Sequence, residues 1–168
     1  KLGDILPAVL DQVDAWANAP GGVTGLATGI RALDAMTRGL QPGNVVIVAA
    51  RPAMGKSALA QNIEIAVAHA GHTVGSYSLE MGSEEKAIRA VTSEGQIDGH
   101  QLQRGRLSEQ GYGRFSHALG ALSGIPLFID DDPAITVFDI GSRARRLKVE
   151  HGLSLLTVDY VQLVNAAG

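Results

Sequence analysis

Gly55, Lys56 and Ser57 are the residues whose types and order are best suited to chemistry. They follow an apolar run over residues 45–50 and stand at the start of a helical pattern. A strand, a tight loop, Gly-Lys-Ser and a helix, in this order, are typical of a loop that binds phosphate. Backbone N–H groups and the helix macrodipole attract phosphate oxygens there, and the lysine adds a full positive charge. We expect nucleotide binding by the loop and first turn, residues Ala50, Arg51, Pro52, Ala53, Met54, Gly55, Lys56, Ser57 and Ala58.

The loop departs in one place from the usual pattern, G-x-x-x-x-G-K-[ST]. Its first glycine is replaced by Ala50, the smallest substitute, so a left-handed backbone is not expected at that position. Gly-Lys-Ser also occurs by chance at the start of ordinary helices. The apolar run before it, which predicts a strand buried on both faces, favours nucleotide binding.

Two carboxylates stand at the ends of later predicted strands. Asp159 closes an apolar strand roughly 100 residues after the loop, as a Walker B aspartate does, and is expected to hold Mg²⁺ together with the Ser57 hydroxyl. A simple turn at the strand end is its structural alternative. Glu80 ends the strand that follows the loop's helix and is the candidate general base for ATP hydrolysis. A carboxylate that caps the next helix is the alternative for Glu80.

The elements that must position these residues alternate between helices and strands. Amphipathic spacing predicts a first helix over residues 4–18, with Asp4 as N-cap and Pro7 in its first turn. Further helical segments are predicted over residues 31–37, 57–70, 83–95, 96–124 and 137–151. Strands are predicted over residues 45–50, 73–80, 126–130 and 153–160. Strands separated by helices imply a parallel sheet whose ligand edge lies at the carboxyl ends of the strands.

Three features have two interpretations each. The aspartates over residues 130–132 are interpreted as a turn and cap before Pro133, in preference to a metal or water contact. The basic run that begins at Arg143 is interpreted as a solvated helix face rather than a DNA contact. The apolar stripe of the first helix packs either on its own domain or on a neighbouring subunit. The histidines lack ligand spacing, so we assign them no metal.

The composition is that of one globular domain without a disulfide framework. The chain has 168 residues, of which 45% are hydrophobic and none is cysteine. No apolar run approaches the roughly 18 residues of a membrane span, and no signal peptide is recognised, so a cytoplasmic protein without a membrane partner is expected. A net charge of −3 argues against a free-standing nucleic-acid binder. Because the first residue is Lys1, we expect a piece of a longer protein.

In four stretches the chain resembles the RecA-like motor domain of DnaB-type replicative helicases. They are an opening segment over residues 28–34 with 39–43, the Walker A segment 49–57, the glutamate segment 78–81 and the Walker B segment 158–163. Alanine in place of the first Walker A glycine is usual in that family. The resemblance implies a RecA-like P-loop NTPase fold over residues 23–168, α/β with a mostly parallel sheet flanked by helices. A linker helix and linker would precede it over residues 1–22.

The resemblance also implies an activity, cofactors and partners. The activity is ATP hydrolysis coupled to 5′–3′ translocation on single-stranded DNA within a homo-hexameric ring, with ATP and Mg²⁺ as cofactors. Glu80 and Lys56 would be the catalytic residues, and Ser57 and Asp159 would hold the metal. The helix over residues 4–18 would dock on the adjacent subunit. Primase and a helicase loader are the further partners that the family implies.

Several parts of such a helicase cannot be placed within these 168 residues. The γ-phosphate-sensing glutamine, the DNA-binding loops and the arginine finger follow Walker B in the family, and Gln162 stands too close to Asp159 to be that sensor. An arginine finger is worth roughly 10³–10⁵ in rate, so we expect weak nucleotide binding and slow hydrolysis. Two alternatives remain open: another RecA-superfamily ATPase of the RadA or recombinase type, and a non-catalytic nucleotide-binding module that acts on helicase assembly.

Overall fold

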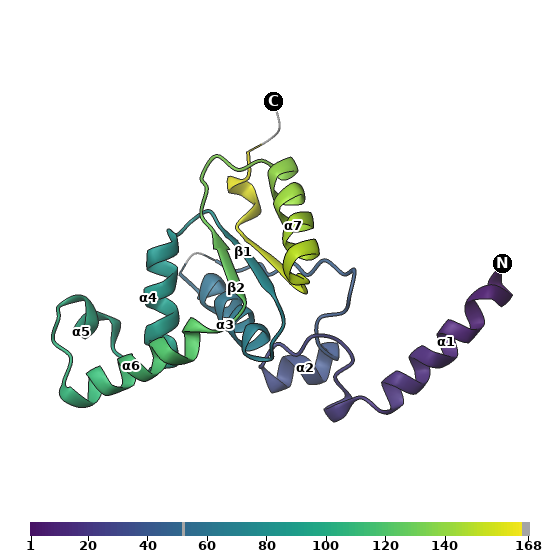
Figure 1. The fold of residues 1–168 in the computed structure, drawn as a ribbon, viewed down its shortest axis with the longest axis horizontal. Helices are drawn as coiled ribbons and strands as arrows, with labels where there is room; N and C mark the ends of the chain where they lie inside the picture. Colours follow the sequence, from purple (N-terminus) through teal and green to yellow (C-terminus); the bar gives the residue numbers. More distant parts are fainter. Residues whose placement is uncertain (52, 166–168) are drawn as a thin grey trace. The chain divides into compact units, whose positions relative to one another are not determined.

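Residues 1–51 and 53–165 are described by the computed structural model, in which the chain divides into two units, residues 1–67 and 68–168. The first unit contains α1 (Leu2–Ala17), the 3₁₀ turn η1 (Pro20–Gly22), α2 (Arg31–Thr37) and most of α3 (Lys56–His69) (Figure 1). The second contains β1 (Val74–Ser78), α4 (Ser83–Glu94), α5 (Gly99–Gln103), α6 (Glu109–Ser123), β2 (Leu127–Asp130), α7 (Val137–His151), β3 (Leu155–Asp159) and the 3₁₀ turn η2 (Val161–Leu163). No helix in these described ranges has the length and apolar character needed to cross a membrane.

The predicted N-terminal helix is present as α1, but it begins two residues earlier than expected. Lys1 is its N-cap, so Asp4 lies in the first turn and Pro7 lies inside the helix. The reason is that Leu2 extends the apolar stripe by one turn, since it stands four residues before Leu6. The stripe is exposed along its length, at Leu2, Leu6, Val9, Leu10, Val13 and Trp16. Docking of this stripe on a neighbouring subunit therefore stays a prediction.

A buried polar contact fixes the start of α2, which has the predicted bounds. The Asp34 carboxylate accepts hydrogen bonds from the Thr28 backbone N–H and from the Thr28 hydroxyl, both at 2.8 Å. Thr28 is 1% exposed and Asp34 is 8% exposed. Hydrogen bonds to a buried charge contribute about 1.5–3 kcal/mol each to stability. Between these two residues, Gly29 has a φ of +79°, and a Cβ there would lie 2.7 Å from the Cβ of Ala66 in α3.

The strand predicted over residues 45–50 is not formed in the structure, and this prediction was wrong. Residues 44–51 have no regular secondary structure, and Val45 and Ile47 are 89% and 85% exposed. An apolar run shows that a strand would be stable when buried, but it does not supply the neighbouring strand. A strand needs backbone partners on its edges, and no ladder involves this run within the described residues.

The second unit is built on a three-stranded parallel sheet with the order β2-β1-β3. All five residues of the central strand β1 are buried, and both of its neighbours run parallel to it. Figure 1 shows β1 between its neighbours, with α7 beside the sheet. Three of the four predicted strands are thus confirmed. β1 is shorter than predicted, so Glu80 lies two residues beyond its end.

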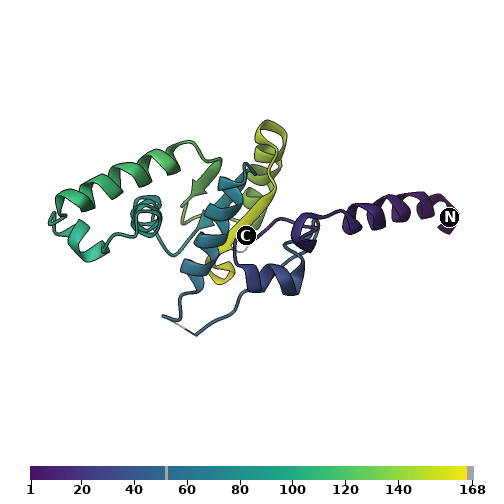
Figure 2. The ribbon, with the colours of Figure 1, turned by 90° about the horizontal axis from the view of Figure 1, so that it is seen from below.

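Side chains from two helices reach opposite faces of β1. On one face, a Cβ at Gly75 would lie 3.0 Å from Leu147 of α7, so this glycine permits close packing of helix on strand. On the other face, Lys86 of α4 donates from Nζ to the Ser76 hydroxyl, which also accepts a hydrogen bond from Thr157 of β3 at 3.2 Å. Lys86 is only 5% exposed. This buried polar cluster joins α4 to two strands. Figure 2 shows the α4–α6 region from a second direction.

Candidate nucleotide-binding and catalytic site

The predicted phosphate-binding loop lies in the first unit, at the start of α3. That helix begins at Lys56, one residue earlier than predicted, and Leu59 donates its N–H to the Gly55 carbonyl at 2.9 Å. Gly55 has a φ of +89° and Ala53 a φ of +63°, whereas Ala50 does not have a left-handed backbone, as expected. Pro52 lies outside the described residues.

The first turn of α3 holds the residues that were expected to contact phosphate and metal. Lys56 and Ser57 are half-buried, and the loop residues Arg51, Ala53, Met54 and Gly55 are exposed, as is Ala58. A turn closed by the Met54 N–H and the Arg51 carbonyl, at 3.3 Å, leads into the helix. The first N–H groups of a helix have no partner within it, so this turn can donate to an anion.

Glu80 and Asp159 lie in the second unit, at the same edge of its sheet. Asp159 is the last residue of β3 and is paired in register with Ser78 at the end of β1. The Leu79 N–H donates to the Asp159 carbonyl at 2.8 Å. The backbone next to the candidate base is therefore bonded directly to the candidate metal ligand. This confirms that the carboxyl ends of these two strands bring the two residues to one edge.

The segment that carries Glu80 runs from the end of β1 to α4 and is held at both sides of the glutamate. The Ser78 hydroxyl donates to the Met81 carbonyl at 2.8 Å. On the far side, the Ser83 N–H donates to Asp131 Oδ2 at 2.7 Å. Gly82 is the N-cap of α4 and provides no side-chain cap. Asp131 is thus a carboxylate that caps this helix from a distant loop.

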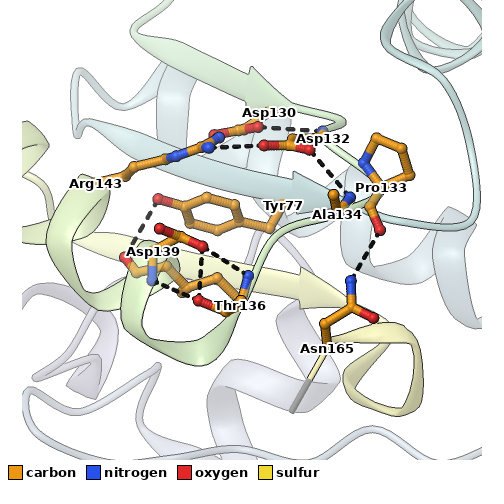
Figure 3. A network of polar contacts seen from close by, with 10 residues as sticks. Tyr77, Asp130, Asp132, Pro133, Ala134, Thr136, Asp139, Arg143 and Asn165 are labelled. Carbon is orange, nitrogen blue, oxygen red and sulfur yellow. Dashed lines mark hydrogen bonds and ion pairs between the residues drawn. The ribbon is translucent and has the colours of Figure 1, made fainter. Parts of the chain in front are cut away.

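The aspartates at the end of β2 form an ion-pair clamp with α7, drawn in Figure 3. Arg143 donates from Nη1 to Asp130 Oδ2 and from Nη2 to Asp132 Oδ2, both at 2.7 Å. The two carboxylates raise the pKa of Arg143, whose hydrogen bond in turn lowers the pKa of Asp132. A turn was predicted for the aspartates, and the N–H groups of Asp132 and Ala134 do bond to carboxylates within it. The basic run was interpreted as a solvated helix face, and Arg145, Arg146 and Lys148 are exposed as expected. Arg143 differs from them because its guanidinium bridges two carboxylates.

The same loop is tied to the start of α7 and to the chain after β3 (Figure 3). Thr136 and Asp139 form a reciprocal capping box, in which the Asp139 N–H donates to the Thr136 hydroxyl and the Thr136 N–H donates to the Asp139 carboxylate. The Thr136 hydroxyl also donates to this carboxylate at 2.6 Å and lowers the pKa of Asp139. Asn165 donates from its side chain to the Pro133 carbonyl at 3.3 Å. Tyr77 of β1 donates to the Ile140 carbonyl at 3.5 Å, and burial raises its pKa. Sequence reasoning missed these contacts, although the capping box has a recognisable T-x-x-D spacing.

The lowered pKa values of Asp131, Asp132 and Asp139 predict acid sensitivity of this loop. The Ser83 N–H, Arg143 and Thr136 respectively lower these values from 3.8. As the pH falls, these carboxylates are protonated in the unfolded chain before they are protonated in the folded one. Their contribution to the free energy of unfolding is therefore fully present above the unfolded pKa, and it is lost as the pH falls through the lower, folded pKa.

Arg143→Met is expected to flatten this acid dependence, because Asp132 would then titrate closer to its unfolded value. At neutral pH the loss of stability is small, since the Arg143 side chain is 39% exposed. The measurement is the urea midpoint at neutral pH and at about pH 3. Arg145→Met, on the same helix, is the matched control. Equal acid-induced falls in the wild type and in Arg143→Met would contradict the assignment.

The donors expected for a metal ion are oxygen atoms of the right kind. Mg²⁺ prefers carboxylate and hydroxyl oxygens and keeps several of its waters, so one serine and one aspartate suffice from the protein. Ser57 and Asp159 fit this donor set, and both are half-buried. Among the described residues, no group of three or more histidine, cysteine, aspartate or glutamate side chains could hold a metal ion.

A parallel sheet with helices between its strands and an acidic residue at a strand end are features of the RecA-like α/β class. Residues 25–168 match the family model of the DnaB-like helicase C-terminal domain. The chain therefore belongs to that family, as the resemblance predicted.

Relatives and solved structures agree with this assignment. The chain is 41% identical to the replicative DNA helicase DnaC of Bacillus subtilis and 40% identical to DnaB of Geobacillus stearothermophilus, over 100% of its own length. It spans 37% of the length of each of these proteins. A solved ATPase domain superposes with a TM-score of 0.92 at 31% identity, covering 100% of this chain and 60% of that one. A DnaB-like replicative helicase, solved in a study of its interactions with primase, superposes with a TM-score of 0.87 at 30% identity. This match covers 98% of the present chain and 40% of the helicase chain.

Proposed function

We propose that this chain is part of the ATP-driven motor of a replicative DNA helicase, with residues 23–168 as the RecA-like core and residues 1–22 as a linker helix and linker. The observation that carries the proposal is the family match over residues 25–168, combined with Glu80 and Asp159 at one sheet edge. Family membership supports nucleotide binding. ATP as the nucleotide and Mg²⁺ as the metal are our proposal.

The residues of the loop and first turn of α3 bind the nucleotide. Backbone N–H groups from Gly55 to Ala58 donate to phosphate oxygens, and Lys56 balances the charge that develops on them. Bound Mg²⁺ would neutralise phosphate charge, and Ser57 and Asp159 would hold it, Asp159 through water. Glu80 orients the attacking water and accepts its proton.

The proposed substrate and assembly rest on the family resemblance. Single-stranded DNA, a homo-hexameric ring, primase and a loader are partners of the motor in this proposal, and the main DNA contacts lie outside this chain. The exposed apolar stripe of α1 is the surface that docks on the adjacent subunit of the ring. A cytoplasmic location suits a replication protein.

A strand-displacement assay on the polypeptide in which this chain naturally occurs tests the proposal. Forked duplexes carrying a single 5′ or 3′ tail are mixed with enzyme and ATP, with Glu80→Gln as the control. We expect ATP-dependent unwinding only from the 5′ tail. Strand exchange without directional unwinding would favour the recombinase-type alternative. An inert protein that changes the assembly of a second, active helicase would favour the non-catalytic module.

A further inference from the structure

We propose that Asp131 is a positioning residue for Glu80, acting through the backbone N–H of Ser83. This inference rests on the proposed role of Glu80 as general base. Asp131 lies in the loop between β2 and α7, 48 residues after Ser83, the first residue of α4, whose N–H it accepts. Its contribution would be to hold the end of the segment from which the glutamate projects.

Three hydrogen bonds hold the backbone on the two sides of Glu80. Leu79 donates to the Asp159 carbonyl at 2.8 Å, and Met81 accepts from the Ser78 hydroxyl at 2.8 Å. The third is the 2.7 Å bond from the Ser83 N–H to Asp131. The first two come from the strands that end at this edge. Of these three anchors, the third alone comes from the β2–α7 loop.

The sequence of α4 provides no side-chain cap at the N-cap position. A helix N-terminus exposes N–H groups that the residue at the N-cap usually satisfies with a side-chain oxygen. The N-cap here is Gly82, which has no side chain, and the first turn carries Glu84 and Glu85 without a capping box. Asp131 instead accepts from the N–H of Ser83, the first residue of the helix, and it does so from a distant part of the chain. The bond to the Ser83 N–H also lowers the pKa of Asp131, so the carboxylate is charged at neutral pH.

Asp131 is itself held in place by its neighbours. Asp130 and Asp132, on either side of it, are both bound to Arg143 of α7 at 2.7 Å. Because an ion pair lies on each side of it, the Asp131 backbone has little freedom, and its side chain stays oriented toward the Ser83 N–H of α4. The clamp therefore transmits the position of α7 to the segment that carries Glu80.

Loss of the Ser83 bond would free the first turn of α4 and the segment before it. A displacement of the order of 1 Å of a catalytic group can lower the rate by about 10²-fold. Nucleotide binding depends on the loop before α3, so the affinity should be unaffected. We therefore expect Asp131→Ala to lower kcat by about tenfold or more while KM stays within about twofold.

The experiment compares four variants by ATPase kinetics, thermal unfolding and amide hydrogen exchange at Ser83. Asp131→Ala removes the acceptor. Asp131→Asn keeps an oxygen that can accept the Ser83 N–H and should restore most of kcat. Asp98→Ala is the matched control, because the Asp98 carboxylate also accepts a backbone N–H at a helix start, that of His100 at 2.8 Å, but acts as the local N-cap of α5. Glu80→Gln tests whether Glu80 acts as the general base.

Each outcome separates the positioning role from a merely structural one. Reduced kcat, unchanged KM, faster exchange at Ser83 and rescue by Asp131→Asn, with normal kcat in Asp98→Ala, would support the inference. A fall in melting temperature with kcat no lower than in Asp98→Ala would overturn it, leaving Asp131 as a helix cap. If Glu80→Gln retained full turnover, the proposed base would fail, and the positioning role would fall with it.

Discussion

Replacement of Glu80 by glutamine is expected to leave Mg-ATP binding intact and to lower ATP hydrolysis by about 10²- to 10⁴-fold, the usual contribution of a general base. Glutamine has the size of glutamate and keeps a hydrogen-bonding oxygen, but it cannot accept a proton at neutral pH. The backbone that carries Glu80 is fixed to Asp159 by a 2.8 Å hydrogen bond, so the substitution should leave the segment in place.

The measurement is hydrolysis of labelled ATP under single-turnover conditions, which resolve slow rates, together with a separate binding titration. Glu84→Gln is the matched control, because Glu84 is an exposed glutamate in the first turn of α4. Its rate should equal that of the wild type. A Glu80→Gln variant as fast as the Glu84→Gln control would refute the assignment of the base.

Replacement of Lys56 by alanine is expected to weaken nucleotide binding by about 10- to 100-fold, because a hydrogen bond to a charged group contributes about 1.5–3 kcal/mol. Lys56 is the first residue of α3 and is half-buried, so its charge acts where water screens less than at an exposed site. Fluorescent ATP titration measures the change. Lys1→Ala, in the same unit, removes an equal charge from an exposed residue and should bind as the wild type does. Equal affinities in both variants would contradict a phosphate contact.

Elements whose start and stop signals are local were predicted well from the sequence. The helix over residues 137–151 has the predicted bounds, since Thr136 and Asp139 cap its start and Gly152 ends it with a φ of +71°. The predicted bounds of the helix over residues 31–37 also agree with the structure. In both cases the residues that decide the boundary are neighbours in sequence, and a pattern search can find them.

Features that depend on a distant partner were not predicted. The apolar run over residues 45–50 has the composition of a buried strand, but strand formation requires a neighbour that the run itself does not specify. The run of three aspartates at the end of β2 predicted a turn. It did not show that Arg143 binds two of them and that the third caps α4.

The candidate site was predicted as a set of residue types at the ends of strands. Because parallel strands present their carboxyl ends at one edge, Glu80 and Asp159 were expected together, and the register of β1 with β3 confirms this. The roles of Lys56, Ser57, Glu80 and Asp159 stay predictions. The anchors of the Glu80 segment were missed, since each is a single hydrogen bond between residues that no motif connects.

The most direct test of a nucleotide site in this chain is a calorimetric titration of the 168-residue protein with ATP, in the presence and absence of Mg²⁺. Circular dichroism on the same sample shows whether the helices are folded. We predict weak, saturable binding that Mg²⁺ strengthens and that ADP displaces. A folded chain that binds no ATP with or without Mg²⁺ would contradict the account.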